Sequence, residues 1–444
     1  MRAALPGATP ADWWRPQVVT AGASTPGRGE GEVVGSGTSR LAHGAFVAFT
    51  CVLLLAPQNL IPFLGSIRIA LLTGTLAIVA HVADRWSKGQ PLARPGREMG
   101  LAAGLVIWTL LTLPFSQWPG GSIALFLSLY VKSLAVFWLI GNLVDTWPRL
   151  RGMAWTLTLL TLALALVGIS NYFSGVFGPA RDQRILGYDA GLTRNPNDLA
   201  LMLNLIIPIG VALLLASRGP LLRGVLVAAL ALQAAAVILT FSRAGFLTLA
   251  TTSCLYGLRL IMRPSRGLVL VALAVAALGL PFVPASYVER LLTLRSIEAD
   301  PTGSAQARWT GTVAALEHVG ANPILGAGLG MNILVLNESV GATWRVVHNT
   351  YLEYAVDLGV PGLVLFGLLL LRSWQSARLA RALGSTGTAQ LAEGVEISLV
   401  GFAVAAVFQP VAYQFYFFYI AGLAVAARTV AAAEAAGRRE QASA

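Results

Sequence analysis

The sequence has very little charge for its length. Of its 444 residues, only 11% are Asp, Glu, Lys or Arg, whereas 56% are hydrophobic. A soluble domain has roughly 25% charged residues, so this composition excludes an ordinary water-soluble fold. Apolar stretches recur instead, many of them near the roughly 20 residues that cross a bilayer as a helix. The sequence therefore predicts an all-α, polytopic membrane protein.

Cysteine and histidine are also scarce. The two cysteines, Cys51 and Cys254, both lie in apolar stretches, which excludes a disulfide framework and a zinc site built from cysteines. The four histidines lie far apart, with no His-x-x-x-His or Asp-x-Asp pair that would suit a metal ion. The glycine-rich residues 326–330 lack the preceding strand of a dinucleotide-binding loop. We therefore expect no metal and no cofactor.

Basic residues outnumber acidic residues by 31 to 20, but they are scattered over short connections. The formal net charge of +11 therefore does not indicate nucleic-acid binding. The positive-inside rule assigns the arginine-rich connections between apolar segments, and hence both chain ends, to the cytoplasm. Twelve segments are predicted, at residues 42–56, 64–83, 98–114, 121–143, 152–173, 197–217, 220–240, 244–262, 267–283, 351–371, 395–409 and 411–427.

The chain divides into a tail, a membrane domain and a second tail. Residues 1–40 are rich in Gly, Pro, Ser and Thr and lack the apolar region of a cleavable signal, so we expect a disordered cytoplasmic tail. Residues 41–430 form the membrane domain, and residues 431–444 form a cytoplasmic tail. A large extracytoplasmic loop, residues 284–350, interrupts the membrane domain. Within that loop, residues 304–319 are predicted to form a helix outside the membrane or on its surface.

Eight arginines lie on the predicted outer side, where membrane topology disfavours them. A polyanionic ligand would explain the excess, because guanidinium groups bind phosphate well. Arg194 and Arg243 each lie at the start of a predicted helix. The alternatives are helix capping around Arg194 and contact of Arg243 with lipid phosphates. The eight residues are Arg181, Arg184, Arg194, Arg243, Arg290, Arg295, Arg308 and Arg345.

Three further residues are candidates for chemistry. His348 lies where the large loop meets the next membrane helix, and the helix dipole there favours the neutral imidazole that a general base needs. The alternative is a histidine that only caps the helix. Lys132 lies about eleven residues, roughly 16 Å, from either end of its segment, so it needs a partner or a cavity. Arg68, near the outer end of its helix, binds an anion or reaches the membrane interface.

Several short stretches together resemble the superfamily of O-antigen ligases and O-antigen polymerases, which are bacterial membrane glycosyltransferases. The resemblance covers about residues 185–370 and depends on the order and spacing of the motifs. No motif matches around Arg68 and Lys132, and Ala244 stands where relatives often have glycine. The matching stretches are Thr193-Arg194-Asn195-Pro196-Asn197-Asp198, Thr240-Phe241-Ser242-Arg243-Ala244-Gly245, Ala307-Arg308-Trp309, Asn322-Pro323-Ile324-Leu325-Gly326-Ala327-Gly328, His348-Asn349-Thr350-Tyr351-Leu352-Glu353 and Leu358-Gly359-Val360-Pro361-Gly362.

The resemblance implies a GT-C-like helical fold and a metal-independent, inverting glycosyltransferase. Such proteins transfer a sugar chain from undecaprenyl pyrophosphate to an acceptor at the periplasmic face of the Gram-negative inner membrane. The histidine matched by His348 deprotonates the acceptor hydroxyl, and the arginines matched by Arg243 and Arg308 bind the pyrophosphate. Arg194, Lys132 and Arg68 are further candidates for pyrophosphate binding, the last two from their chemistry alone.

Ligation to lipid A-core, polymerisation of repeat units and transfer to protein hydroxyls share these motifs. We favour the ligase because a single large loop ending at His348 and the compact size suit that branch, and polymerase is the alternative. A secondary transporter could use Lys132 as a midplane charge, but the sequence shows no inverted repeat. A metal-dependent glycosyltransferase is disfavoured because the first outer loop, residues 57–63, contains no acidic residue.

Overall fold

All regular structure in the described part of the chain is helical. The computed structural model describes residues 38–59, 61–177, 184–185, 191–193, 195–262, 304–341 and 345–443, and none of these residues forms a strand. Ten helices among them are long and apolar enough to cross a membrane, and they match ten of the twelve predicted segments. The first predicted segment corresponds to the shorter helix α1 (Arg40–Leu55), and the segment at 267–283 lies outside the described residues. The predicted all-α membrane fold is confirmed.

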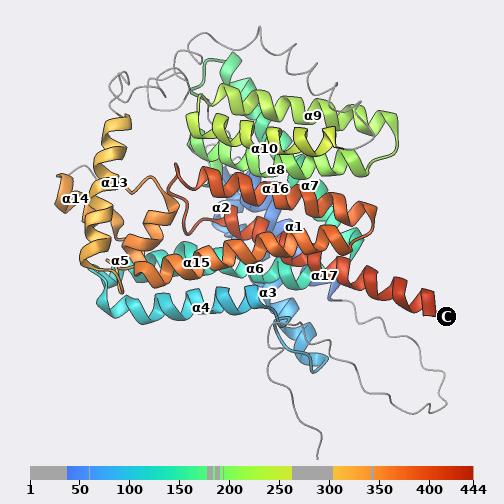
Figure 1. Cartoon of the computed structure of the whole chain (residues 1–444), viewed down its shortest axis with the longest axis horizontal. Coiled ribbons are helices and arrows are strands. Elements are labelled where there is room, and N and C mark those ends of the chain that lie inside the picture. The colour runs from blue at the N-terminus through green and yellow to red at the C-terminus, as the bar shows by residue number, and fades with distance from the viewer. Residues whose placement is uncertain are drawn as a thin grey trace, which may run out of the picture. The chain divides into compact units, whose positions relative to one another are not determined.

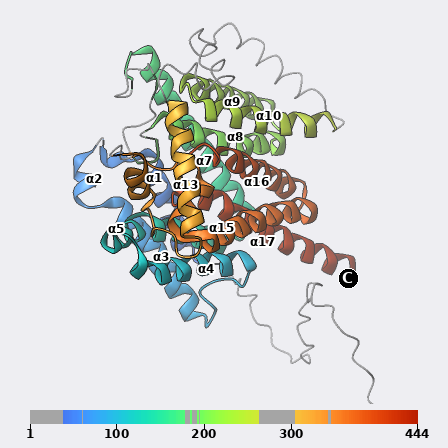
Figure 2. The same cartoon turned by 60° about the vertical axis from the view of Figure 1, so that its left-hand side comes forward.

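The long helices run side by side, and α13 runs across their ends (Figures 1 and 2). Helix α13 begins and ends close to the limits predicted for the helix in the large loop. The helices after α1 are α2 (Pro62–Ser66), α3 (Ile69–Ser87), α4 (Arg97–Thr112), α5 (Pro119–Leu125), α6 (Val131–Leu143), α7 (Trp147–Phe173), α8 (Pro196–Ala216), α9 (Pro220–Leu239), α10 (Arg243–Ile261), α13 (Ser304–Ala321), α14 (Asn332–Val340), α15 (Thr350–Leu383), α16 (Thr386–Ala405) and α17 (Phe415–Ser443).

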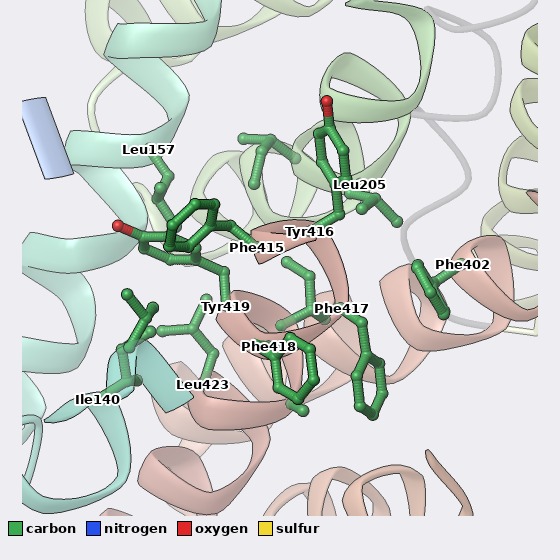
Figure 3. Packing of buried hydrophobic residues seen from close by; sticks show 14 of the residues in the cluster. Ile140, Leu157, Leu205, Phe402, Phe415, Tyr416, Phe417, Phe418, Tyr419 and Leu423 are labelled. Carbon is green, nitrogen blue, oxygen red and sulfur yellow. The ribbon is translucent and has the colours of Figure 1, made fainter. Parts of the chain in front are cut away.

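The first half of helix α17 forms the centre of the bundle. Every residue from Phe415 to Ala427 is buried. An apolar helix in a membrane can face lipid or protein, so the burial of every residue is what places this half inside the bundle. Figure 3 shows aromatic side chains leaving α17 in several directions. The residues around them come from α6, α7, α8 and α16, and they include Ile140, Leu157, Leu205 and Phe402.

Buried acidic residues are paired with arginines at one end of the bundle. Glu396 of α16 lies 2.9 Å from Arg259 and 2.9 Å from Arg381. Glu98 of α4 lies 2.6 Å from Arg428 of α17. A buried carboxylate needs such a partner, because burial without one is strongly unfavourable. Helix α16 begins at Thr386, so the predicted start of this segment at residue 395 was wrong. The helix includes Glu393 and Glu396, which are paired with arginines.

Helix α15 is broken at Gly359, at the opposite end of the bundle from these ion pairs. The φ and ψ angles of Gly359 are 67° and −178°, a conformation that favours glycine. We call residues 322–330 the docking loop, because their backbone lies in this break. The hydrogen bonds at the break are Ala327 N to Val356 O (2.7 Å), Gly328 N to Asp357 O (2.8 Å), Val360 N to Pro323 O (2.8 Å) and Trp108 Nε1 to Leu358 O (2.8 Å).

Replacing Gly359 by alanine is expected to destabilise the protein. A Cβ atom there would lie 2.0 Å from the carbonyl oxygen of Ile324, and a non-glycine residue at this φ is strained by roughly 1–3 kcal/mol even before the clash. At Gly367, on the same helix, a Cβ atom would have no neighbouring atom within 4 Å, so Gly367→Ala is the matched control. Thermal unfolding in detergent should show a lower Tm for Gly359→Ala only, and equal Tm values would contradict the role of the break.

Candidate active site at His348

His348 lies immediately before α15, but it does not cap this helix. The side chain of the next residue, Asn349, accepts hydrogen bonds from the backbone N–H groups of Tyr351 and Leu352. The Nδ1 atom of His348 lies 2.8 Å from the carbonyl oxygen of Val346. A carbonyl only accepts, so Nδ1 is the donor, and in the neutral ring Nε2 has the lone pair. Nε2 is therefore the atom that can receive a proton.

The surroundings of His348 favour its neutral form. Burial lowers the pKa of His348 below its usual value of 6.5, and the positive charges of Arg308 and Arg345 lower this pKa further. The hydrogen bond to Val346 opposes these effects only in part. The structure thus brings Arg308, from the first turn of α13, within electrostatic range of His348. A neutral imidazole at neutral pH is the protonation state that a general base requires.

A cavity of about 420 Å³ lies beside His348. Its walls come from the first turn of α8, the start of α14, the start of α15 and the turn between α16 and α17, with Leu125 and Leu129 on one side. Among the described residues that line it there is no lysine or arginine. Its polar lining includes His348, the carboxylates of Asp198 and Glu353, and the amides of Asn195, Asn197 and Asn332.

The buried carboxylate of Asp357 holds the chain that leads to His348. It accepts hydrogen bonds from the backbone N–H groups of Gly330 (2.9 Å) and Asn332 (2.6 Å) and from the hydroxyl of Tyr413 (2.9 Å). The Oδ1 atom of Asn332 in turn accepts from the N–H of Val347 (3.0 Å). Sequence reasoning missed Asp357, although an acidic residue in an apolar membrane segment is itself a signal.

Arg243 lies at the first position of α10, at the same end of the bundle. The hydroxyl of Ser242 accepts from the N–H of Gly245 (3.1 Å) and donates to Oδ1 of Asn197 (2.8 Å). Arg184 also donates to this Asn197 oxygen (2.7 Å). Asn197 lines the cavity, so the turn before Arg243 is tied to the cavity wall. Arg243 itself is half-buried, and it is not among the described residues that line the cavity.

Arg68 and Lys132 are not among the described residues that line the cavity. Arg68 is exposed at the start of α3, with a φ of 50°. Lys132 is exposed on α6, directly after the π-helical turn at Phe126–Tyr130. Arg194 lies outside the described residues. Pyrophosphate binding by these three residues therefore stays a prediction. Within the described part of the chain, no group of three or more His, Cys, Asp or Glu side chains is placed to bind a metal ion.

One segment of the chain matches a known protein family. Residues 226–367 match the model of a family described as O-antigen ligase. Over this segment the chain is similar to O-antigen ligases. This family includes ligases and polymerases, so the predicted resemblance is confirmed at the level of membrane glycosyltransfer of the ligase or polymerase type. No curated protein matches the chain.

The matched segment includes Arg243, Arg308 and His348, and it also includes Glu353 and Asp357. Arg68, Lys132 and Arg194 lie before it. The matched segment supplies His348 and fewer than half of the described residues that line the cavity. The other lining residues come from the start of α8, from the turn between α16 and α17, and from Leu125 and Leu129.

Replacing Asp357 by asparagine is expected to lower both stability and glycosyl transfer. The amide has one accepting oxygen where the carboxylate has two, so at least one of the donors on Gly330, Asn332 or Tyr413 would lose its partner, at about 1–3 kcal/mol. The matched control is Glu338→Gln, an exposed acidic residue on α14. Thermal unfolding in detergent and a transfer assay would test this, and wild-type values for Asp357→Asn would refute the positioning role.

Proposed function

We propose that this protein transfers O-antigen polysaccharide from undecaprenyl pyrophosphate to a sugar hydroxyl of lipid A-core, at the periplasmic face of the Gram-negative inner membrane. The observation that supports this proposal most is the neutral His348 beside a cavity at one end of a bundle of membrane-length helices. An acceptor hydroxyl in the cavity can reach a base there, while the lipid parts of both substrates stay in the bilayer. No metal ion is required for this chemistry.

The reaction is a single displacement. The Nε2 atom of His348 takes the proton of the acceptor hydroxyl, and the oxygen attacks the anomeric carbon of the donor sugar. The bond from that carbon to the pyrophosphate oxygen breaks, so undecaprenyl pyrophosphate leaves and the configuration is inverted. Arg243 and Arg308 bind the pyrophosphate and stabilise the negative charge that grows on it. Arg194, Lys132 and Arg68 are further candidates for this binding.

The alternative acceptors require the same chemistry. A polymerase would add the sugar chain to a second lipid-linked glycan, and a protein O-oligosaccharyltransferase would add it to a protein hydroxyl. Reconstitution with undecaprenyl-pyrophosphate-linked polysaccharide, lipid A-core and an acceptor protein, followed by analysis of which product has gained sugar, separates the three. Sugar on lipid A-core is the expected result. A lengthened lipid-linked glycan, with no lipid A-core product, would replace ligase by polymerase.

Replacing His348 by alanine is expected to abolish most of the transfer activity. Loss of a general base typically lowers kcat by roughly 10²- to 10⁴-fold, whereas binding of the lipid-linked donor should persist. His318→Ala, on α13, is the matched control, since His318 is not among the described residues that line the cavity. A chelator should leave the wild-type rate unchanged. A fully active His348→Ala variant together with inhibition by chelator would overturn the mechanism.

The pH dependence of the transfer rate should report the pKa of His348. Because burial and two arginines lower this pKa below 6.5, the rate should fall to half of its maximum at a pH below 6.5, as the imidazole becomes protonated. Arg345→Gln removes one positive charge that lowers the pKa, so the acid limb of kcat/KM should move to higher pH. Arg97→Gln, an exposed arginine at the opposite end of the bundle, is the control. An unmoved limb in Arg345→Gln would contradict this account.

A further inference from the structure

The cavity beside His348 is lined by groups that suit a neutral polyhydroxylated ligand. The described lining residues contribute two carboxylates, Asp198 and Glu353, together with several side-chain amides, and no lysine or arginine. Arg308 and Arg345 act electrostatically on His348 but are not among the described residues that line the cavity, so a phosphate there would contact two acidic side chains and no cation. Sugar hydroxyls can instead donate to carboxylate and amide oxygens and accept from amide N–H groups. The lining therefore favours the sugar over the pyrophosphate.

Glu353 is the lining residue with the clearest capacity for a ligand. Glu353 is only 6% exposed. Its Oε2 atom accepts a hydrogen bond from the N–H of Ala412 (3.1 Å), which fixes the carboxylate against the turn between α16 and α17. No hydrogen bond of its Oε1 atom is formed among the described residues, and Glu353 lines the cavity. A carboxylate so far removed from bulk water is expected to have a partner for each oxygen.

Asp357, one turn further along α15, shows what a structural carboxylate looks like in this helix. Both of its oxygens accept hydrogen bonds from groups of the protein, namely Gly330, Asn332 and Tyr413, and Asp357 is not among the residues that line the cavity. Glu353 is held through one oxygen and presents the other to the cavity. The two acidic residues are therefore used differently, and only Glu353 is placed to contact a ligand.

Asp198 supplies a second accessible carboxylate from a different helix. It lies in the first turn of α8, where the cap is Asn195, so Asp198 is not needed as the capping residue. Its side chain has no hydrogen-bond partner within the described part of the chain, and it lines the same cavity as Glu353. Both acidic residues lie in the first turn of their helices. A ligand in the cavity thus meets acidic side chains from two helices.

We propose that Glu353, assisted by Asp198, binds hydroxyl groups of the acceptor sugar, and that the cavity selects an uncharged accepting sugar over one with a phosphate or carboxylate beside the reacting hydroxyl. This inference rests on the proposed function and specifies its acceptor. Glu353 is a substrate-binding residue in this account. It orients the acceptor, and the proton of the reacting hydroxyl goes to His348. The pyrophosphate of the donor remains outside the cavity.

The first test is a steady-state analysis of Glu353→Gln and Asp198→Asn in the reconstituted protein, with Glu338→Gln as a matched control. Loss of a hydrogen bond to a charged acceptor should raise the KM for the acceptor roughly tenfold, with the KM for the donor and the pH profile unchanged. Thermal unfolding in detergent verifies that each variant is folded. A merely structural role would change stability and both KM values together, and this result would overturn the proposal.

The second test compares two acceptors that differ by a phosphate on the accepting sugar. The wild-type protein should use the uncharged acceptor at least about tenfold better, which corresponds to roughly 1.4 kcal/mol, and the double variant Glu353→Gln/Asp198→Asn should lose much of this preference. Equal use of both acceptors by the wild-type protein would refute the selectivity. A collapse of kcat in Glu353→Gln at unchanged acceptor KM would also refute it, because Glu353 would then be the base.

The proposed transfer reaction and the proposed acceptor site can be distinguished by experiment. If the wild-type protein transfers sugar to no lipid-linked or protein acceptor, the proposed function fails and this inference fails with it. If the wild-type protein is active and His348→Ala is inactive, but both KM values are unchanged in Glu353→Gln and Asp198→Asn, only the inference about the acceptor site fails.

Discussion

The hydrogen bonds between the docking loop and the broken helix α15 position most of the site. A break in a membrane helix exposes backbone groups that water cannot reach, so other parts of the protein must satisfy them. The docking loop and the indole of Trp108 do so for Val356, Asp357 and Leu358. Because the loop is fixed there, its end at Gly330 meets the carboxylate of Asp357, and the start of α14 is placed beside the segment before His348.

Buried glutamates have different roles at the two ends of the bundle, because their neighbours differ. At the end remote from His348, Glu98, Glu393 and Glu396 are nearly fully buried and each contacts an arginine. These carboxylates join helices that are distant in the sequence. Glu353 is also buried, but only one of its oxygens is bonded to the protein. Burial alone therefore does not identify a functional acid. Glu98 contacts an arginine, whereas Glu353 lines the cavity beside His348.

Residues of the site could be predicted where the neighbouring sequence alone indicates their role. His348 follows a long polar loop and precedes an apolar segment, and this position alone suggested a neutral histidine. The helix caps were harder to assign, because several polar residues stand side by side at each helix start. Asn195 and Asn349 are the caps, whereas Asn197 accepts hydrogen bonds from Ser242 and Arg184. The position of Lys132 in the middle of its segment predicts a partner or a cavity, yet its side chain is exposed on α6.

By itself the sequence determined the helical membrane fold, ten apolar segments that the structure describes as membrane-length helices, the resemblance to O-antigen ligases and the position of His348. These properties depend on hydropathy summed over about 20 neighbouring residues and on short motifs, both of which are local. Only the tertiary structure decided that Asp357 holds Asn332, that Glu353 faces the cavity and that Lys132 does not. Each of these depends on which distant backbone or side-chain groups lie within hydrogen-bond distance, and the folding of the whole bundle sets those distances.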